Sequence, residues 1–297
     1  MRSALHVTLL AAGIFTSALT IAPPASAACT ANDASEAAPR RAVNAAALGN
    51  ILADARMALA DGDFAEACVK FRLVLSVDPG NLDARVGLGE GALGEGDGVL
   101  AQSHFLAVTN AAEDNVIAWQ GLGLALLSVN DPVRAEPYLR RAVDRDPTLW
   151  RAWNGLGVIA DTRSDWPAAD AAWQAGIAAA PAETALFNNK GMSLMQRGDA
   201  QAAIEAFDEA LRLRPNLQMA SNNRRLALAL TGDYDGALSG LNDAALPTAM
   251  NNVAVVAARR GDRAIADRLL AAALTAAPRY YELAARNREA LARSPRR

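Results

Sequence analysis

The sequence overlays itself when it is shifted by 34 residues, and this internal repeat constrains the fold more than any other feature of the chain. Seven repeats follow one another without a gap, and the sixth is shortened to 29 residues. Their ranges are 48–81, 82–115, 116–149, 150–183, 184–217, 218–246 and 247–280. A period of this length is typical of architectures in which each repeat is one supersecondary unit stacked on its neighbours.

Three positions define the repeat. Position 16 is always aspartate, namely Asp63, Asp97, Asp131, Asp165, Asp199, Asp233 and Asp262. Position 20 is always alanine, namely Ala67, Ala101, Ala135, Ala169, Ala203, Ala237 and Ala266. Position 24 is always bulky and apolar, namely Phe71, Phe105, Leu139, Trp173, Phe207, Leu241 and Leu270. The small residues allow close packing within a repeat, and the bulky residue fills the space between repeats.

The residues around position 16 predict a break between two helices. Position 15 is usually glycine, which ends a helix in a left-handed turn. The aspartate that follows caps the next helix by accepting hydrogen bonds from its first backbone N–H groups. Proline at position 32 of five repeats stops the second helix. Each repeat is therefore expected to be a helical hairpin.

These positions together resemble the tetratricopeptide repeat (TPR) family. The resemblance implies an all-α fold, a right-handed α-solenoid of stacked helical hairpins. The first helix of each repeat would line a concave groove, and the second would form the outer wall. An apolar stripe that starts at Tyr280 and ends at Leu291 predicts a capping helix, followed by a frayed tail, within residues 281–297. Position 8 is small in most repeats but is Arg225 in the sixth, where we expect a locally adapted core.

The chain opens with features of an export signal over residues 1–28, followed by a linker or N-terminal extension over 29–47. Arg2 precedes an apolar run, and Ala25-Ser26-Ala27 fits a cleavage site. Cys29 leaves three alternatives open: lipid attachment as in bacterial lipoproteins, a free thiol, or a disulfide with Cys68 in an oxidising compartment. Cys68 falls within a helix pattern, which favours a buried and inert cysteine.

Composition argues against catalysis and nucleic-acid binding. The formal charge is −3, from 29 basic and 32 acidic residues, so the chain lacks a domain-wide basic footprint. Two histidines leave little for acid–base chemistry, and no nucleophile–base pair or metal-ligand spacing is present. The string from Gly89 to Gly94 matches a dinucleotide fingerprint by letters only, because no strand precedes it. We predict no enzyme activity, cofactor or metal; the glycine-rich stretch through Gly98 predicts a loosened helix or a hinge. An enzyme with its active site in the groove is the rival hypothesis.

Asparagines recur where the family's first helices face the groove. The candidate peptide-binding residues are Asn154, Asn188, Asn189, Asn222, Asn223, Asn251 and Asn252, with Lys190, Arg224 and Arg225 beside them. An amide carries both a donor and an acceptor, so it can bond a peptide backbone without reading its side chains. The basic residues could neutralise acidic side chains or a terminal carboxylate. The alternative is that some of these asparagines bond neighbouring helices.

Within the family, the chain resembles the TadD-type proteins of tight-adherence (Flp) pilus assembly. The resemblance is carried by the signal ending at Cys29, the Asn222-Asn223 and Asn251-Asn252 pairs, and the shortened sixth repeat. It implies an exported scaffold in the periplasm or at the outer membrane of a Gram-negative bacterium. Its partners would be proteins or peptide segments of the envelope, including secretin or pilus components. The alternative is a generic periplasmic adaptor for other envelope or cell-wall machinery.

Overall fold

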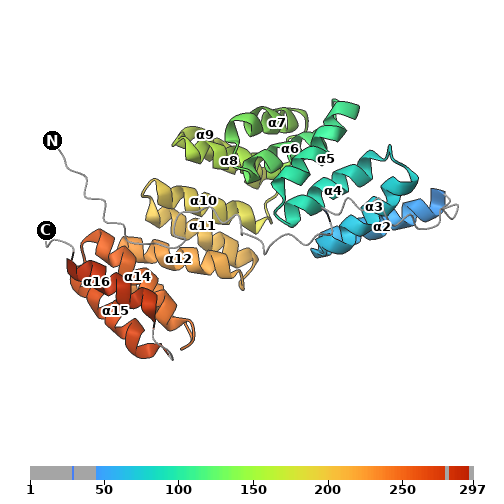
Figure 1. Ribbon diagram of the computed structural model, residues 1–297. Coiled ribbons are helices and arrows are strands. Elements are labelled where there is room, and N and C mark those ends of the chain that lie inside the picture. Colours follow the sequence, from blue (N-terminus) through green and yellow to red (C-terminus); the bar gives the residue numbers. More distant parts are fainter. Residues whose placement is uncertain (1–28, 30–44, 278–280, 294–297) are drawn as a thin grey trace. The chain divides into compact units, whose positions relative to one another are not determined.

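The computed structural model describes residues 29, 45–277 and 281–293, and all regular secondary structure in them is helical (Figure 1). This confirms the all-α prediction. The chain divides into two compact blocks. The N-terminal block holds Cys29 and residues 45–181, and the C-terminal block holds residues 182–293 among those described. No helix in the described ranges is both long and apolar enough to cross a membrane.

The N-terminal block consists of four helical hairpins in two layers. Its helices are α2 (Ala45–Asp61), α3 (Phe64–Val77), α4 (Leu82–Gly94), α5 (Gly98–Ala111), α6 (Val116–Ser128), α7 (Pro132–Arg145), α8 (Trp150–Thr162) and α9 (Trp166–Ala179). The first helices α2, α4, α6 and α8 contact one another in that order. The second helices α3, α5 and α7 each pack against their own first helix and against the next one.

The C-terminal block repeats this arrangement with one shortened hairpin. Its helices are α10 (Thr184–Gln196), α11 (Ala200–Leu213), α12 (Gln218–Thr231), α13 (Tyr234–Leu238), α14 (Leu246–Arg260), α15 (Arg263–Ala276) and α16 (Glu282–Arg293). The first-helix layer is α10, α12, α14 and α16, in contact in that order. Since α13 has only five residues, the sixth repeat lacks most of its second helix.

The aspartate position caps the second helices as expected. Six of the seven side chains accept a hydrogen bond from a backbone N–H in the first turn, as Asp63 does from Glu66 at 3.0 Å. Each such cap contributes about 1 kcal/mol to helix stability. The exception is Asp262, whose carboxylate accepts from the hydroxyl of Tyr234 instead. At the turn position, Asn130 and Ser164 adopt positive φ angles of 61° and 56°, as the glycines do.

The bulky position-24 side chains pack against glycines of the first helices. The ring of Phe105 lies where β-carbons on Gly89 and Gly121 would stand, and Leu139 lies in the same way against Gly123 and Gly155. A side chain from one hairpin therefore packs against the backbones of two first helices. The expected loosened helix at the glycine-rich stretch is wrong, because α4 is continuous from Leu82 to Gly94 and its glycines are packing sites.

The packing role of these glycines predicts a clear contrast between two alanine substitutions. We expect Gly121→Ala to lower the free energy of unfolding by about 1–3 kcal/mol, because the new methyl group would overlap the Phe105 ring. Gly49→Ala on α2, where no atom lies within 4 Å of the new carbon, is the control. It is expected to raise stability by about 0.5–1 kcal/mol through helix propensity. Urea unfolding measures both, and equal effects would contradict this account of the packing.

Candidate peptide-binding groove

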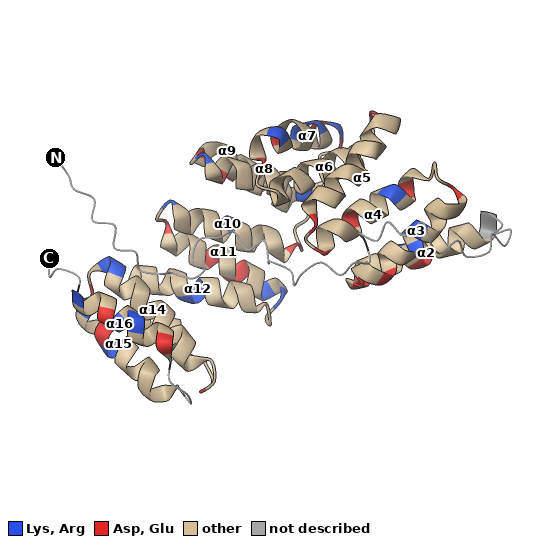
Figure 2. Cartoon of the chain, in the orientation of Figure 1, with Lys and Arg blue, Asp and Glu red and all other residues tan. Residues whose placement is uncertain are grey.

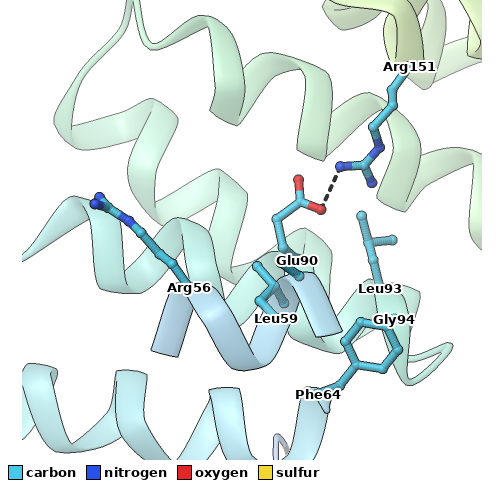
Figure 3. Close-up of a pocket in the computed structure, with 8 residues that line it drawn as sticks. Arg56, Leu59, Phe64, Glu90, Leu93, Gly94 and Arg151 are labelled. Atoms are coloured by element: carbon cyan, nitrogen blue, oxygen red, sulfur yellow. Dashed lines mark hydrogen bonds and ion pairs between the residues drawn. The ribbon is translucent and has the colours of Figure 1, made fainter. Parts of the chain in front are cut away.

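Residues of α2, α4 and α8, together with the start of α3, line an open cavity of about 410 Å³ (Figure 3). It is lined by Arg56, Leu59, Ala60, Phe64, Glu90, Leu93, Gly94 and Arg151, from α2, α3, α4 and α8. A second cavity of about 270 Å³ shares Arg56, Leu59 and Glu90 with it. We call these two cavities the groove. Its lining combines apolar side chains with four ionised ones, Arg56, Asp83, Glu90 and Arg151.

An ion pair spans the groove between helices two repeats apart. Arg151 of α8 donates from Nη1 to Oε2 of Glu90 on α4 at 2.7 Å, across 61 residues of sequence. The Glu90 side chain is only 15% exposed, so water screens this pair less than an open surface pair. The Arg56–Asp83 pair, at 2.8 Å between α2 and α4, is 58% and 66% exposed and contributes little to stability.

Lysine and arginine are interspersed with aspartate and glutamate along the helices of each block (Figure 2). The groove itself brings two guanidinium groups and two carboxylates together with Leu59, Leu93 and Phe64. Such a lining can bury an apolar side chain while the guanidinium groups donate hydrogen bonds to carbonyl or carboxylate oxygens.

Comparison with known proteins identifies the family to which the repeats belong. A family model described as tetratricopeptide repeat matches residues 86–149, 121–184, 159–218 and 188–253, which together span more than half of the chain. The chain belongs to the tetratricopeptide repeat family. In this family the helical hairpins typically form scaffolds for protein interaction rather than catalytic sites. No curated protein matches this TPR chain.

Several solved TPR structures are similar to the chain. A tetratricopeptide repeat protein from Parabacteroides merdae ATCC 43184 is 10% identical with a TM-score of 0.53, over 82% of this chain and 98% of that one. YrrB, described as a TPR protein with an unusual peptide-binding site, is 21% identical with a TM-score of 0.43, over 57% and 88%. MamA from Desulfovibrio magneticus RS-1 is 16% identical with a TM-score of 0.46, over 60% and 96%. The first similarity shows the fold alone.

Two of the predicted groove asparagines are buried between TPR repeats. Asn188 and Asn251 are 4% and 2% exposed. Asn188 Oδ1 accepts from Asn223 of the next first helix at 3.0 Å, and Asn251 Oδ1 accepts from Asn287 of α16 at 2.9 Å. A buried amide needs hydrogen-bond partners, and these amides find them in the neighbouring repeat. The expectation that Asn188 and Asn251 face a bound peptide is therefore wrong. Their side chains join successive TPR repeats through hydrogen bonds.

The other predicted asparagines keep some exposure but lie in different blocks. Asn154 is half-buried on α8 of the N-terminal block. Asn189 on α10 and Asn252 on α14 are half-buried, and Asn222 on α12 is exposed and accepts from Gln218. Lys190 on α10 is half-buried. Peptide contact by these residues stays a prediction.

The two adjacent arginines of α12 have structural partners. Arg224 Nε donates to Asp208 of α11 at 2.5 Å. Arg225 Nη1 donates to the carbonyl oxygens of Ala237 and Ser239, at 2.9 and 2.8 Å, at the end of the short α13. Burial, followed by repulsion from Arg224, lowers the pKa of Arg225. The expected role of Arg225 in the groove is corrected, because its guanidinium group bonds two backbone carbonyls. A role of Arg224, whose ion pair is partly exposed, stays a prediction. Arg225 replaces the usual small residue where the second helix is cut short.

Removing Arg225 tests that explanation. We expect Arg225→Ala to lower the free energy of unfolding by about 2–3 kcal/mol, because it deletes charge-assisted bonds to two carbonyls. Arg224→Ala removes only a partly exposed ion pair and is expected to cost less than about 1 kcal/mol. Thermal or urea unfolding of the two neighbouring variants measures the difference. Equal losses would show that Arg225 has no special role at the shortened repeat.

Sequence reasoning missed Arg56, Glu90 and Arg151. Glu90 lies inside the segment 89–94, which matches a dinucleotide fingerprint by letters only. The usable signal was position 9, which carries Arg56 and Glu90 in consecutive repeats and so places opposite charges on one first-helix face. No pattern in the sequence indicated that Arg151, two repeats away from Glu90, would reach it.

Both cysteines form a disulfide. Cys29 and Cys68 are bonded, with their Cα atoms 5.2 Å apart and 39 residues between them in sequence. Cys68 is buried as predicted, and the disulfide corrects the expectation that it is inert. Of the three alternatives for Cys29, the structure has the disulfide. Lipidation at Cys29 would need the same sulfur for its thioether and stays a prediction.

Proposed function

We propose that this TPR protein is a non-catalytic scaffold that binds a peptide segment of a partner protein in the groove of the N-terminal block. The cavity between α2, α4 and α8 carries the proposal, since it combines an apolar floor with guanidinium donors. Burying one large apolar side chain of a partner against Leu59, Leu93 and Phe64 would contribute about 1.5–3 kcal/mol. Arg56 and Arg151 would supply the polar contacts that fix the orientation of the segment.

Filling the cavity tests this proposal. Ala60 lines the cavity and is exposed, so Ala60→Trp would occupy the cavity without disturbing the core. Ala171→Trp on α9 introduces the same side chain at an exposed position outside the groove lining and is the matched control. The probe is a fluorescent peptide selected from a random library on the oxidised protein. Anisotropy should show Kd about tenfold or more weaker for Ala60→Trp and unchanged for the control. Equal binding by both variants would refute the groove as the site.

A second contact region on the C-terminal block follows from the remaining asparagines. Asn222 is exposed, and Asn252 is half-buried and accepts a hydrogen bond from Asn251 at 3.3 Å. The probe for this region is a second peptide, selected from the same library on the Ala60→Trp variant. The double variant Asn222→Ala/Asn252→Ala should bind it several-fold more weakly if these amides hold its backbone. Circular dichroism checks the fold of the double variant, because Asn252 accepts a hydrogen bond from the buried Asn251. Unchanged affinity would remove the asparagine row from the binding surface.

The wider proposal is that the protein is exported to the cell envelope and supports assembly of a tight-adherence pilus or related secretion machine. The signal-like residues 1–28 support export, and a disulfide fits an oxidising compartment. Its partners would then be envelope proteins, including secretin or pilus components. Deleting the gene should abolish surface pili, and the wild-type gene should restore them while Ala60→Trp does not. Normal pili in the deletion strain would favour the generic periplasmic adaptor instead.

A further inference from the structure

The disulfide lies in the packed interior beside the groove. Cys68, in the second turn of α3, is fully buried, and Cys29 is 5% exposed. Both sulfur atoms face the backbone of α4 at Gly91. A β-carbon at Gly91 would lie 2.5 Å from Sγ of Cys68 and 3.4 Å from Sγ of Cys29. The disulfide therefore rests on α4 at a residue that leaves no side chain in between.

The same two helices form a wall of the cavity. Glu90, Leu93 and Gly94, which flank Gly91 on α4, line it, and so does Phe64 at the start of α3. The ring of Phe64 packs where a β-carbon of Gly94 would stand. The α3–α4 contact is thus fixed by the two sulfur atoms at Gly91 and by the aromatic ring one turn further along α4. A shift of α4 against α3 at either contact would change the lining of the cavity.

Two free thiols need more room at this contact than the disulfide does. Bonded sulfur atoms stand closer together than two unbonded ones can, and the opposing surface is helix backbone rather than a flexible side chain. We infer that the Cys29–Cys68 disulfide positions α4 as a wall of the groove, so that the groove is completed only when both thiols are oxidised, and that Cys29 carries no lipid. The inference rests on the proposed function for the use of the groove, but not for its formation.

The chemistry is thiol–disulfide exchange with a protein disulfide as the oxidant. One cysteine thiolate attacks a sulfur of the oxidant and forms a mixed disulfide, and the second thiolate displaces the oxidant from it. The two cysteines lose two electrons and two protons, and the oxidant leaves as a dithiol. Because Cys29 uses its sulfur in this bond, the same atom is not free to form a lipid thioether.

Hydrogen exchange of the full mature protein tests the first half of the inference. The reductant dithiothreitol is raised in steps, and the reduced fraction is measured by alkylation and mass spectrometry. In the reduced protein the amides of the second half of α4 should be accelerated at least about tenfold more than those of α8, while α11 keeps its protection. Cys29→Ser should match the reduced wild type without added reductant. Unchanged exchange in α4, or the same acceleration in α4 and α8, would overturn the positioning role.

The intact mass of the protein from its native host tests the second half. We expect a chain lighter than the reduced form by two hydrogen atoms. A diacylglyceryl group on Cys29 would overturn the assignment. Neither measurement uses a peptide, so a failure of the proposed peptide binding leaves both readouts intact, and the two hypotheses fail separately.

Discussion

Replacing Phe105 with alanine is expected to lower the free energy of unfolding by about 3–5 kcal/mol, one of the two largest effects of any change considered for this chain. The ring is completely buried on α5 and packs against Gly89 of its own repeat and Gly121 of the next. Because both contacts are glycines, neither of these two residues has a side chain that could fill the space that the ring leaves. The substitution would open a cavity between the first helices of two repeats.

Leu106→Ala is the matched control for this prediction. Leu106 follows Phe105 on the same helix but is 40% exposed, so its truncation is expected to cost less than about 1 kcal/mol. Urea unfolding followed by circular dichroism compares the two variants. Similar midpoints for both would mean that the contact between repeats does not depend on the position-24 side chain.

Loss of the Cys29–Cys68 disulfide is expected to cost about 4 kcal/mol of unfolding free energy. The bond closes a loop across a sequence separation of 39 residues, and the chain-entropy estimate for a loop of this size gives that magnitude. Breaking the disulfide stabilises mainly the unfolded chain, because its conformational entropy rises when the loop is no longer closed. The measurement is a urea titration of the wild type with and without dithiothreitol.

The double variant Cys29→Ser/Cys68→Ser is the control for that titration. Its midpoint should match the reduced wild type and should not respond to dithiothreitol. If the oxidised and reduced wild types unfold at the same urea concentration, the disulfide either does not form or adds no stability, and the account of the N-terminal block is wrong.

The repeat architecture could be predicted from the sequence because each structural role recurs at a fixed position. Asp63 and its equivalents cap helices through a local hydrogen bond, so the local sequence specifies the outcome. Glycine or its substitute Asn130 ends the first helix for an equally local reason. The pairing of a bulky residue such as Phe105 with small residues at position 8 also repeats along the chain.

The groove was much less predictable, because its contacts join residues far apart in the sequence. The Arg151–Glu90 pair depends on how successive repeats rotate against one another, which no single repeat encodes. The asparagine positions were correctly placed on the first helices, but burial of Asn188 and Asn251 depends on Asn223 and Asn287 in the following helix. Arg225 is explained only by the missing turns of α13.

The most direct test of the account is to map a bound peptide on the oxidised protein by NMR. The peptide selected from the random library is titrated into isotope-labelled protein, and backbone amide and leucine methyl shifts are followed. We predict the largest changes at Leu59, Glu90 and Leu93, around the groove. Changes confined to exposed positions of the second helices, such as Val99 and Val133, would contradict the central claim that the first-helix face binds the partner.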